Sequence, residues 1–249
     1  MRTRAPRLLS RARQRLARGA LLALCLWPAV PAAAAEVITA ARYVDPTTRY
    51  AHGILGDAIE HGTLELTLAD GTRRRMVLPD SLVFEDTTPR LVDVTGDGAP
   101  EVIVVESSLT QGARLALYDA KGRIAATPHI GSRNRWLAPI GAADLDGDGQ
   151  IEIAYIDRPH LAKTLRLWRV SKGALVHLAD LPGYTNHRIG EPDIAGGIRT
   201  CSGMPEMIVA NADWSRLTAL RYTNGNFQVT DLGVDTTRTS FAAALSCTP

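Results

Sequence analysis

The stretch Asp144-Leu-Asp-Gly-Asp-Gly-Gln-Ile-Glu152 decides the fold of this chain. Acidic residues stand at positions 1, 3, 5 and 9 of the stretch, and glycines at positions 4 and 6 permit a tight turn. Ca²⁺ takes about six to eight oxygen ligands and accepts irregular geometry. The sequence therefore predicts a structural Ca²⁺ site with ligands from Asp144, Asp146, Asp148, the Gln150 carbonyl and Glu152.

Two alternatives compete with a metal loop between β-strands. An EF-hand needs a bidentate Glu at position 12 and flanking helices, but position 12 is Tyr155 and both flanks have strand-like patterns. A solvated turn without metal is the second alternative, because Asp and Gly are favoured in turns anyway.

The loop is one of three similar segments. Their leading acids, Asp93, Asp144 and Asp193, lie 51 and 49 residues apart. The first segment predicts a second, weaker site, since Thr95 replaces a carboxylate by a hydroxyl. Its predicted ligands are Asp93, Thr95, Asp97, the Ala99 carbonyl and Glu101. The third segment has lost its acids after Asp193, so we expect no metal there.

Each segment is followed by the same succession of strands. An apolar strand comes first, then an alternating strand that ends in Lys-Gly or Asn-Gly, a signal for a tight hairpin turn, and then another short strand. The two strands that follow each segment are expected at 101–105 and 114–118, 152–155 and 164–168, and 206–209 and 216–220.

Units of four antiparallel strands, repeated about every 50 residues, predict an all-β fold, a small β-propeller. The length suits four blades, or five shorter ones. Residues 63–68 and 75–78 supply the later strands of one blade, and 241–245 lines up with 141–145 as its missing first strand. N- and C-terminal strands would then close the ring. A β-sandwich is the alternative.

Residues 1–35 have the pattern of a secretory signal peptide. Seven Arg and no acid precede an apolar stretch of about 11 residues and a small-residue cleavage pattern ending at Ala35. Such a stretch is too short to span a bilayer. We expect a domain over 36–249, periplasmic or secreted, without a transmembrane anchor; lipidation at Cys25 is a minor alternative.

Removal of residues 1–35 changes the charge of the chain. Seven of the 28 basic residues and none of the 26 acidic ones lie there, so 21 basic and 26 acidic residues remain. Nucleic acid is therefore not an expected partner. Of the three cysteines, Cys201 and Cys247 remain, and in an oxidising compartment we expect them to pair.

Loops of the form D-x-D-G-D-G-x-x-E between apolar strands resemble the FG-GAP or VCBS repeats of integrin-α-type propellers. The resemblance covers roughly residues 89–210. It implies Ca²⁺ binding by Asp144, Asp146, Asp148 and Glu152, and by the corresponding residues of the first segment. Family resemblance of this kind names a fold more than a function.

Basic and aromatic residues gather in the loops expected at the opposite end of the strands. A basic mouth on an acidic protein suggests an anionic ligand, such as an acidic glycan, or a protein partner. The candidate rim residues are Arg133, Arg135, Trp136, Arg158, His160, His187, Arg188, Trp214 and Arg238, with His52 near them. Solvated rim charges without a ligand are the simpler alternative.

Two functions follow from these residues. The first is a non-enzymatic, Ca²⁺-stabilised binding module. The second is a hydrolase or lyase acting on an anionic, glycan-like substrate, with His160 or His187 as general base beside Arg188. The sequence holds no nucleophile elbow, zinc motif or phosphate-binding loop that would support an enzyme, so the module is the preferred hypothesis.

Overall fold

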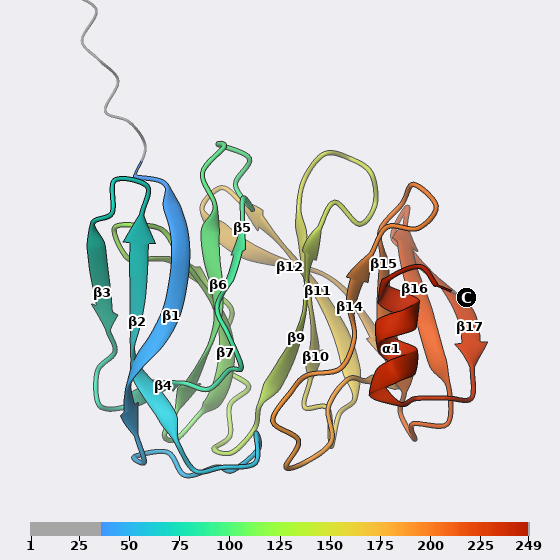
Figure 1. Cartoon of the computed structure of the whole chain (residues 1–249), viewed down its shortest axis with the longest axis horizontal. Helices are drawn as coiled ribbons and strands as arrows, with labels where there is room; N and C mark the ends of the chain where they lie inside the picture. Colours follow the sequence, from blue (N-terminus) through green and yellow to red (C-terminus); the bar gives the residue numbers. More distant parts are fainter. Residues whose placement is uncertain (1–35, 249) are drawn as a thin grey trace, which may run out of the picture. The chain divides into compact units, whose positions relative to one another are not determined.

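A computed structural model describes residues 36–248, which form three antiparallel sheets and one helix (Figure 1). The predicted signal peptide and the Cys25 alternative lie outside the described residues. In the first sheet the strands follow the order β1-β2-β4-β6-β7-β8, with β3 on β2 and β5 on β6. These strands are β1 (Ile38–Thr47), β2 (Glu60–Leu68), β3 (Arg73–Val77), β4 (Leu82–Phe84), β5 (Arg90–Val92), β6 (Glu101–Ser108), β7 (Gly112–Tyr118) and β8 (Arg123–Ala126).

The second and third sheets repeat the pattern of β5 to β8. The second has the order β12-β11-β10-β9, from β9 (Leu137–Ala143), β10 (Glu152–Asp157), β11 (Thr164–Ser171) and β12 (Ala174–Pro182). The third has the order β13-β15-β16-β17 with β14 on β15, from β13 (Tyr184–Thr185), β14 (Gly197–Arg199), β15 (Glu206–Asn211), β16 (Leu217–Thr223) and β17 (Asn226–Gly233). The all-β class and the repeated antiparallel unit are confirmed.

The central strands are buried on both faces, which explains their unbroken apolar runs. In β6, Ile103 and Val105 pack in a cluster with β9 and β10, whereas Val102 and Val104 pack in a cluster with Leu64 of β2. A further apolar cluster lies between the second and third sheets. Each sheet therefore covers the next through alternate side chains of its central strands.

The predicted strand at 241–245 is wrong. These residues belong to α1 (Arg238–Leu245), whose N-cap is Thr237, with a side chain that accepts a hydrogen bond from the Ser240 N–H. An Ala-rich segment after a Thr cap favours helix over strand. Phe241 and Ala244 pack on the third sheet, and the predicted closing pair of terminal strands is not formed within residues 36–248.

The Cys201–Cys247 disulfide is present and ties the segment after β14 to the end of α1. β1 was not predicted, and it forms a full ladder with β2. Among the described residues, no helix has the length and apolar character needed to cross a membrane.

The disulfide should contribute to the stability of the last sheet. It closes a loop with a sequence separation of 46 residues, and such a cross-link stabilises by roughly 2–4 kcal/mol, largely by restricting the unfolded chain. We expect Cys201→Ser/Cys247→Ser to lower the urea midpoint by a corresponding amount, and reduced wild type to match the variant. An unchanged midpoint after reduction would contradict this expectation.

Candidate functional site

The two ends of the sheets carry different chemistry. Two loops that we call the Asp loops, 93–101 and 144–152, connect the first two strands of their units and lie at the top of Figure 1. The opposite end, which we call the rim, is built from the loops at 48–59, 133–136, 157–163, 186–191 and 213–216.

A glycine at the start of β7 lets one rim segment approach the sheet. Gly112 has φ +71°, and a Cβ there would lie 2.6 Å from the Arg135 carbonyl oxygen. That carbonyl accepts the Ala113 N–H at 2.8 Å. Trp136 is buried, and its indole Nε1–H donates to the Glu85 carbonyl at 2.8 Å. Arg135 and Trp136 are therefore held in place by backbone hydrogen bonds.

Two rim histidines meet beneath Trp136. His187 is fully buried, and its ring lies edge-on to Trp136 with centroids 4.9 Å apart. Its Nε2 lies 2.9 Å from the Glu191 carbonyl, so Nε2 donates, and Nδ1 accepts from His160 Nε2 at 3.1 Å. Burial is the first cause that lowers the pKa of both rings, that of His160 to about 4. Both are neutral near pH 7.

A carboxylate–histidine pair lies beside them. His52 Nδ1 is 2.6 Å from Glu85 Oε1, and Ser107 Oγ donates to the other carboxylate oxygen. Glu85 is fully buried, and this burial raises its pKa, while its bond to His52 acts in the opposite direction. Glu60 is also buried; desolvation first, and then the charges of Glu85 and other carboxylates, raise its pKa to about 9.

A small cavity opens between these groups. His52, Arg135, Trp136, Arg158 and His160 line it, together with other residues, and its volume is about 30 Å³. That space holds little more than a water molecule. An organic ligand at this end would therefore lie over the rim rather than inside it.

Most other rim cations already have partners. Arg158 forms an ion pair with the adjacent aspartate at 2.9 Å. The Arg188 guanidinium lies 3.9 Å above the Trp214 ring, a cation–π contact. Arg238 forms ion pairs with acidic residues of the 191–193 segment. These side chains are fixed by intramolecular contacts.

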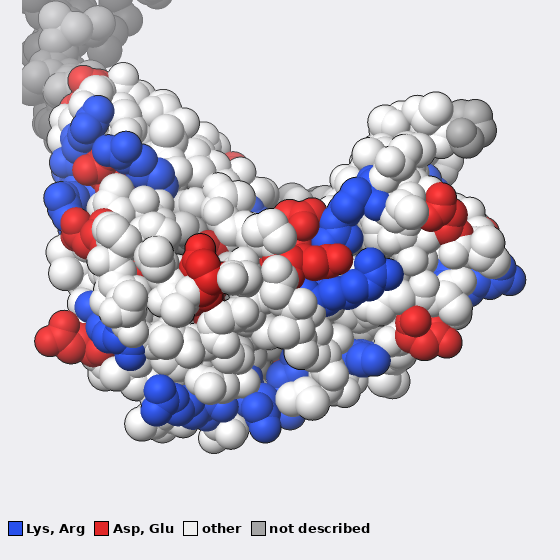
Figure 2. Space-filling model, turned by 60° about the horizontal axis from the view of Figure 1, so that its bottom comes forward, with Lys and Arg blue, Asp and Glu red and all other residues white. Residues whose placement is uncertain are grey.

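Arg133 and Arg135 differ from these side chains. Neither forms an ion pair with a carboxylate within residues 36–248, and Arg133 is exposed. When the lower end of the molecule is turned forward, Lys and Arg side chains form a row along its lower part (Figure 2). The rim thus offers cationic groups that intramolecular pairing does not neutralise.

The two Asp loops share one hydrogen-bond pattern. In each, the leading acid, Asp93 or Asp144, accepts the backbone N–H groups three, four and five residues later. The buried glutamate at position 9, Glu101 or Glu152, accepts the N–H of the residue after the leading acid. The two Asp loops, which the sequence predicts to be equivalent, therefore share the same backbone hydrogen bonds.

The carboxylates of the second loop converge, but a cation already lies among them. Oxygens of Asp144, Asp146 and Glu152 lie within 4.8 Å of one another. Arg169 donates to Asp146 Oδ2 at 3.0 Å, to Asp148 Oδ2 at 2.8 Å and to Glu152 Oε1 at 2.6 Å.

The remaining predicted ligands take part in local contacts. The Gln150 N–H donates to Asp148 Oδ1, and the Ala99 N–H to Asp97 Oδ1, each at 2.8 Å. The Thr95 hydroxyl donates to Glu101 Oε1 at 3.1 Å.

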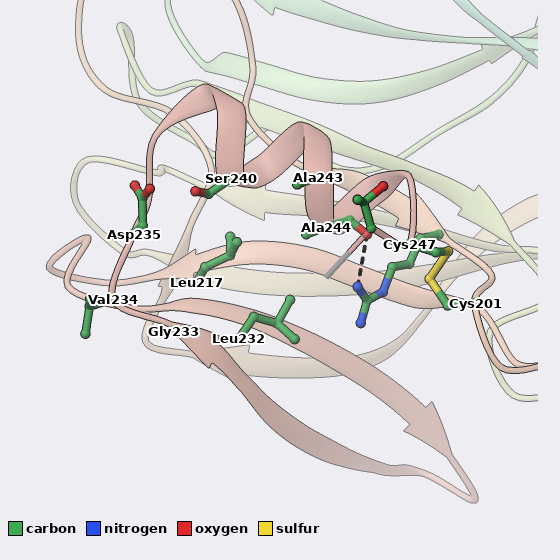
Figure 3. A pocket seen from close by; sticks show the side chains of 12 residues that line it. Cys201, Leu217, Leu232, Gly233, Val234, Asp235, Ser240, Ala243, Ala244 and Cys247 are labelled. Atoms are coloured by element: carbon green, nitrogen blue, oxygen red, sulfur yellow. Dashed lines mark hydrogen bonds between the residues drawn. A yellow bond between two sulfur atoms is a disulfide. The ribbon is translucent and has the colours of Figure 1, made fainter.

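A cavity of about 530 Å³ lies apart from the Asp loops and from the rim histidines (Figure 3). It lies between α1 and the strands β16 and β17, with Leu217, Leu232 and Val234 among its lining residues. Arg199 and the disulfide border it, and Arg199 donates to the Ala244 carbonyl at 3.0 Å. Its mainly apolar lining offers few groups for chemistry.

No sequence pattern marks Glu60 and Glu85 as site residues. Each stands at the end of a strand, where a single acid gives no signal of burial. Nor does any sequence pattern mark Arg169, which is one of two arginines in β11.

Comparison with known proteins supports the repeat. Residues 93–155 match the model of the FG-GAP-like repeat family, so the chain contains an FG-GAP-like repeat. No curated protein matches the sequence. Among solved structures, the rhamnogalacturonan lyase YesW is similar, with 15% sequence identity, a TM-score of 0.40, and coverage of 72% of this chain and 43% of the lyase. The chain spans less than half of the lyase, whose activity is not transferred to it.

Glu60 makes the stability depend on pH. Its pKa is about 9 when folded against an ordinary value of 4.5, so the unfolded chain loses a proton that the folded chain keeps. Its contribution to stability is present below pH 4.5 and is lost as the pH rises towards 9. We expect Glu60→Gln to be more stable than wild type at pH 8 by up to about 5 kcal/mol, at about 1.4 kcal/mol per pH unit above 4.5, and equally stable near pH 4.5.

Thermal or urea unfolding of both proteins between pH 4.5 and 9 measures the difference. Glu36→Gln controls for the loss of an exposed carboxylate. Parallel stability profiles for wild type and Glu60→Gln would show that Glu60 is not held protonated.

Proposed function

We propose that this protein with an FG-GAP-like repeat is an exported, non-enzymatic β-propeller-type module that binds an anionic ligand at its rim. The observation that carries the proposal is the pair Arg133 and Arg135, which lack carboxylate partners within the described residues while the other arginines of the rim have them. Guanidinium groups bind carboxylates and sulfates through paired hydrogen bonds. The adjacent Trp136 segment is held rigid, which limits the entropy lost on binding.

The three sheets supply the propeller part of the proposal. The second sheet is a complete four-stranded unit, and the first sheet repeats its Asp-loop register, since Val92 pairs with Glu101 as Ala143 pairs with Glu152. We propose that these sheets are blades and that α1 covers the last one. The signal-peptide pattern of residues 1–35 and the disulfide support a periplasmic or secreted location.

Binding is favoured over catalysis by the state of the rim histidines. His160 and His187 are neutral and bonded to each other, and the cavity beside them holds little more than a water molecule. An enzyme remains the second candidate because of one contact, the 2.6 Å bond between His52 and buried Glu85. A carboxylate in this position orients an imidazole as a general base.

We further propose that the Asp loops bind Ca²⁺ in a structural role. Their donors are hard oxygens, the type that Ca²⁺ prefers, and three carboxylates of the second loop converge. Arg169 contacts the same carboxylates and must move for an ion to bind there. A cation held by these loops would screen the repulsion between their carboxylates and stabilise the fold by mass action.

Calcium should raise the melting temperature. We expect a midpoint several degrees higher in 1 mM Ca²⁺ than in EGTA, because the ion binds only the folded loops. Mg²⁺ at the same concentration is the control and should have a smaller effect, since it retains its water ligands. Equal midpoints in Ca²⁺ and EGTA would refute the calcium proposal.

The rim should bind polyanions. We expect wild type to bind polygalacturonate or dextran sulfate, but not neutral dextran, in a titration at low salt. Arg133→Ala/Arg135→Ala should weaken binding at least several-fold, because both unpaired guanidiniums are lost. Lys121→Ala/Lys172→Ala removes the same charge from turns at the opposite end and is the matched control.

Two results would contradict this account of the rim. Equal weakening by both double variants would mean that binding follows net charge alone. Turnover of the polyanion by wild type that is lost in His52→Ala would establish the enzyme instead.

A further inference from the structure

One register position distinguishes the repeated units. β10 pairs with β11 so that Arg169 lies opposite Glu152, the last acid of the second Asp loop. In the first unit the ladder pairs Val102 with Tyr118, so the next position opposite Glu101 is Asp119. In the third unit Met207 pairs with Leu220, so the next position, opposite Glu206, is Arg221. The residue opposite the glutamate is therefore Asp119 in the first unit, Arg169 in the second and Arg221 in the third.

In the second unit this arginine occupies the centre of the loop. Its guanidinium contacts Asp146, Asp148 and Glu152, the last of which has no exposed side-chain surface. Arg169 itself is 15% exposed. A planar fork that holds three carboxylates is geometrically specific, and a charge so placed is screened little by solvent.

In the third unit the same arrangement continues without an Asp loop. Arg221 donates to Glu206 Oε1 at 2.8 Å, and Arg199 donates to Oε2 at 3.0 Å. Asp193 lies before β14 and not in the loop between β14 and β15 that corresponds to the Asp loops, and it pairs with Arg238. Here guanidinium groups alone neutralise the buried glutamate.

In the first unit no guanidinium takes this place. The Glu101 carboxylate is held by the N–H groups of Val94 and Thr95 and by the Thr95 hydroxyl. Asp97, Glu101 and Asp119 line a cavity of about 310 Å³ together with Lys121. The first loop thus keeps its carboxylates without a guanidinium among them, although its backbone hydrogen bonds match those of the second loop.

We infer that Arg169 is the built-in cation of the second Asp loop, which competes with Ca²⁺ for Asp146, Asp148 and Glu152. An ion entering this loop must displace a guanidinium with three charged partners, whereas an ion entering the first loop displaces none. The first loop therefore binds Ca²⁺ more tightly than the second, although the second has the more complete acidic motif. The calcium half of the inference rests on the proposed function; the role of Arg169 does not.

Arg169→Met tests the inference, and Arg221→Met is the matched control at the same register. In EGTA, Arg169→Met should melt several degrees below wild type, because three carboxylates lose their cation. Ca²⁺ titration by calorimetry should show at least tenfold tighter binding to the second loop in this variant, and saturating Ca²⁺ should restore most of the lost midpoint. Arg221→Met should leave Ca²⁺ binding unchanged.

Further variants assign the loops. In the wild-type background, Asp93→Asn should abolish the tighter Ca²⁺ site, and Asp144→Asn should leave it. The reverse assignment, or an unchanged affinity of the second loop in Arg169→Met, would overturn the inference. If Arg169→Met does not fold, Arg169→Met/Asp146→Asn/Asp148→Asn removes the uncompensated charges and should fold. If this triple variant also does not fold, the role of Arg169 is contradicted.

Failure of the calcium proposal is distinguishable from failure of this inference. If neither wild type nor Arg169→Met binds Ca²⁺, the calcium proposal is wrong, and the EGTA midpoints alone judge Arg169. If Arg169→Met then melts at the same temperature as wild type, the role of Arg169 is refuted. If it melts lower, and adding Asp146→Asn and Asp148→Asn restores the midpoint, the role is upheld.

Discussion

A buried glutamate at the start of each central strand is the constraint on which the repeated units depend. Glu101, Glu152 and Glu206 are at most 8% exposed, and a carboxylate buried to this extent must be hydrogen-bonded or ion-paired. In the first two units, one oxygen accepts a backbone N–H from the start of the preceding loop. The glutamate thereby fixes the Asp loop against the strand that follows it.

What satisfies the remaining oxygen differs from unit to unit, and this difference determines the chemistry of each loop. A hydroxyl serves in the first unit and a guanidinium in the second, whereas in the third two guanidiniums hold both oxygens, one each. The opposite end of the sheets is free of this constraint. Its loops collect histidines, buried acids and two unpaired arginines, so the scaffold and the proposed ligand surface lie at opposite ends of the same strands.

The sequence was a good guide wherever a local pattern has a local physical cause. Lys172 and Asn224 adopt the positive φ that their predicted turns require, and the central strands and the two Asp loops lie where the repeat spacing placed them. The disulfide joins the two cysteines that lie outside the signal-peptide pattern. The sequence failed where tertiary contacts decide. β1 is largely exposed and pairs with β2 without an apolar alternation. Residues Ala242 to Ala244 are predicted as a strand only because 241–245 align with 141–145, whereas their helix propensity favours α1. The burial of Glu60 and the reach of Arg169 depend on neighbours distant in sequence.

The competition between Arg169 and Ca²⁺ is tested most directly by a structure from crystals grown with Ca²⁺, in which anomalous scattering locates the ion. We expect an ion held by Asp93, Asp97 and Glu101, and the Arg169 guanidinium still bonded to Asp146, Asp148 and Glu152. An ion held by the second loop with Arg169 turned out to solvent, and none in the first loop, would contradict it.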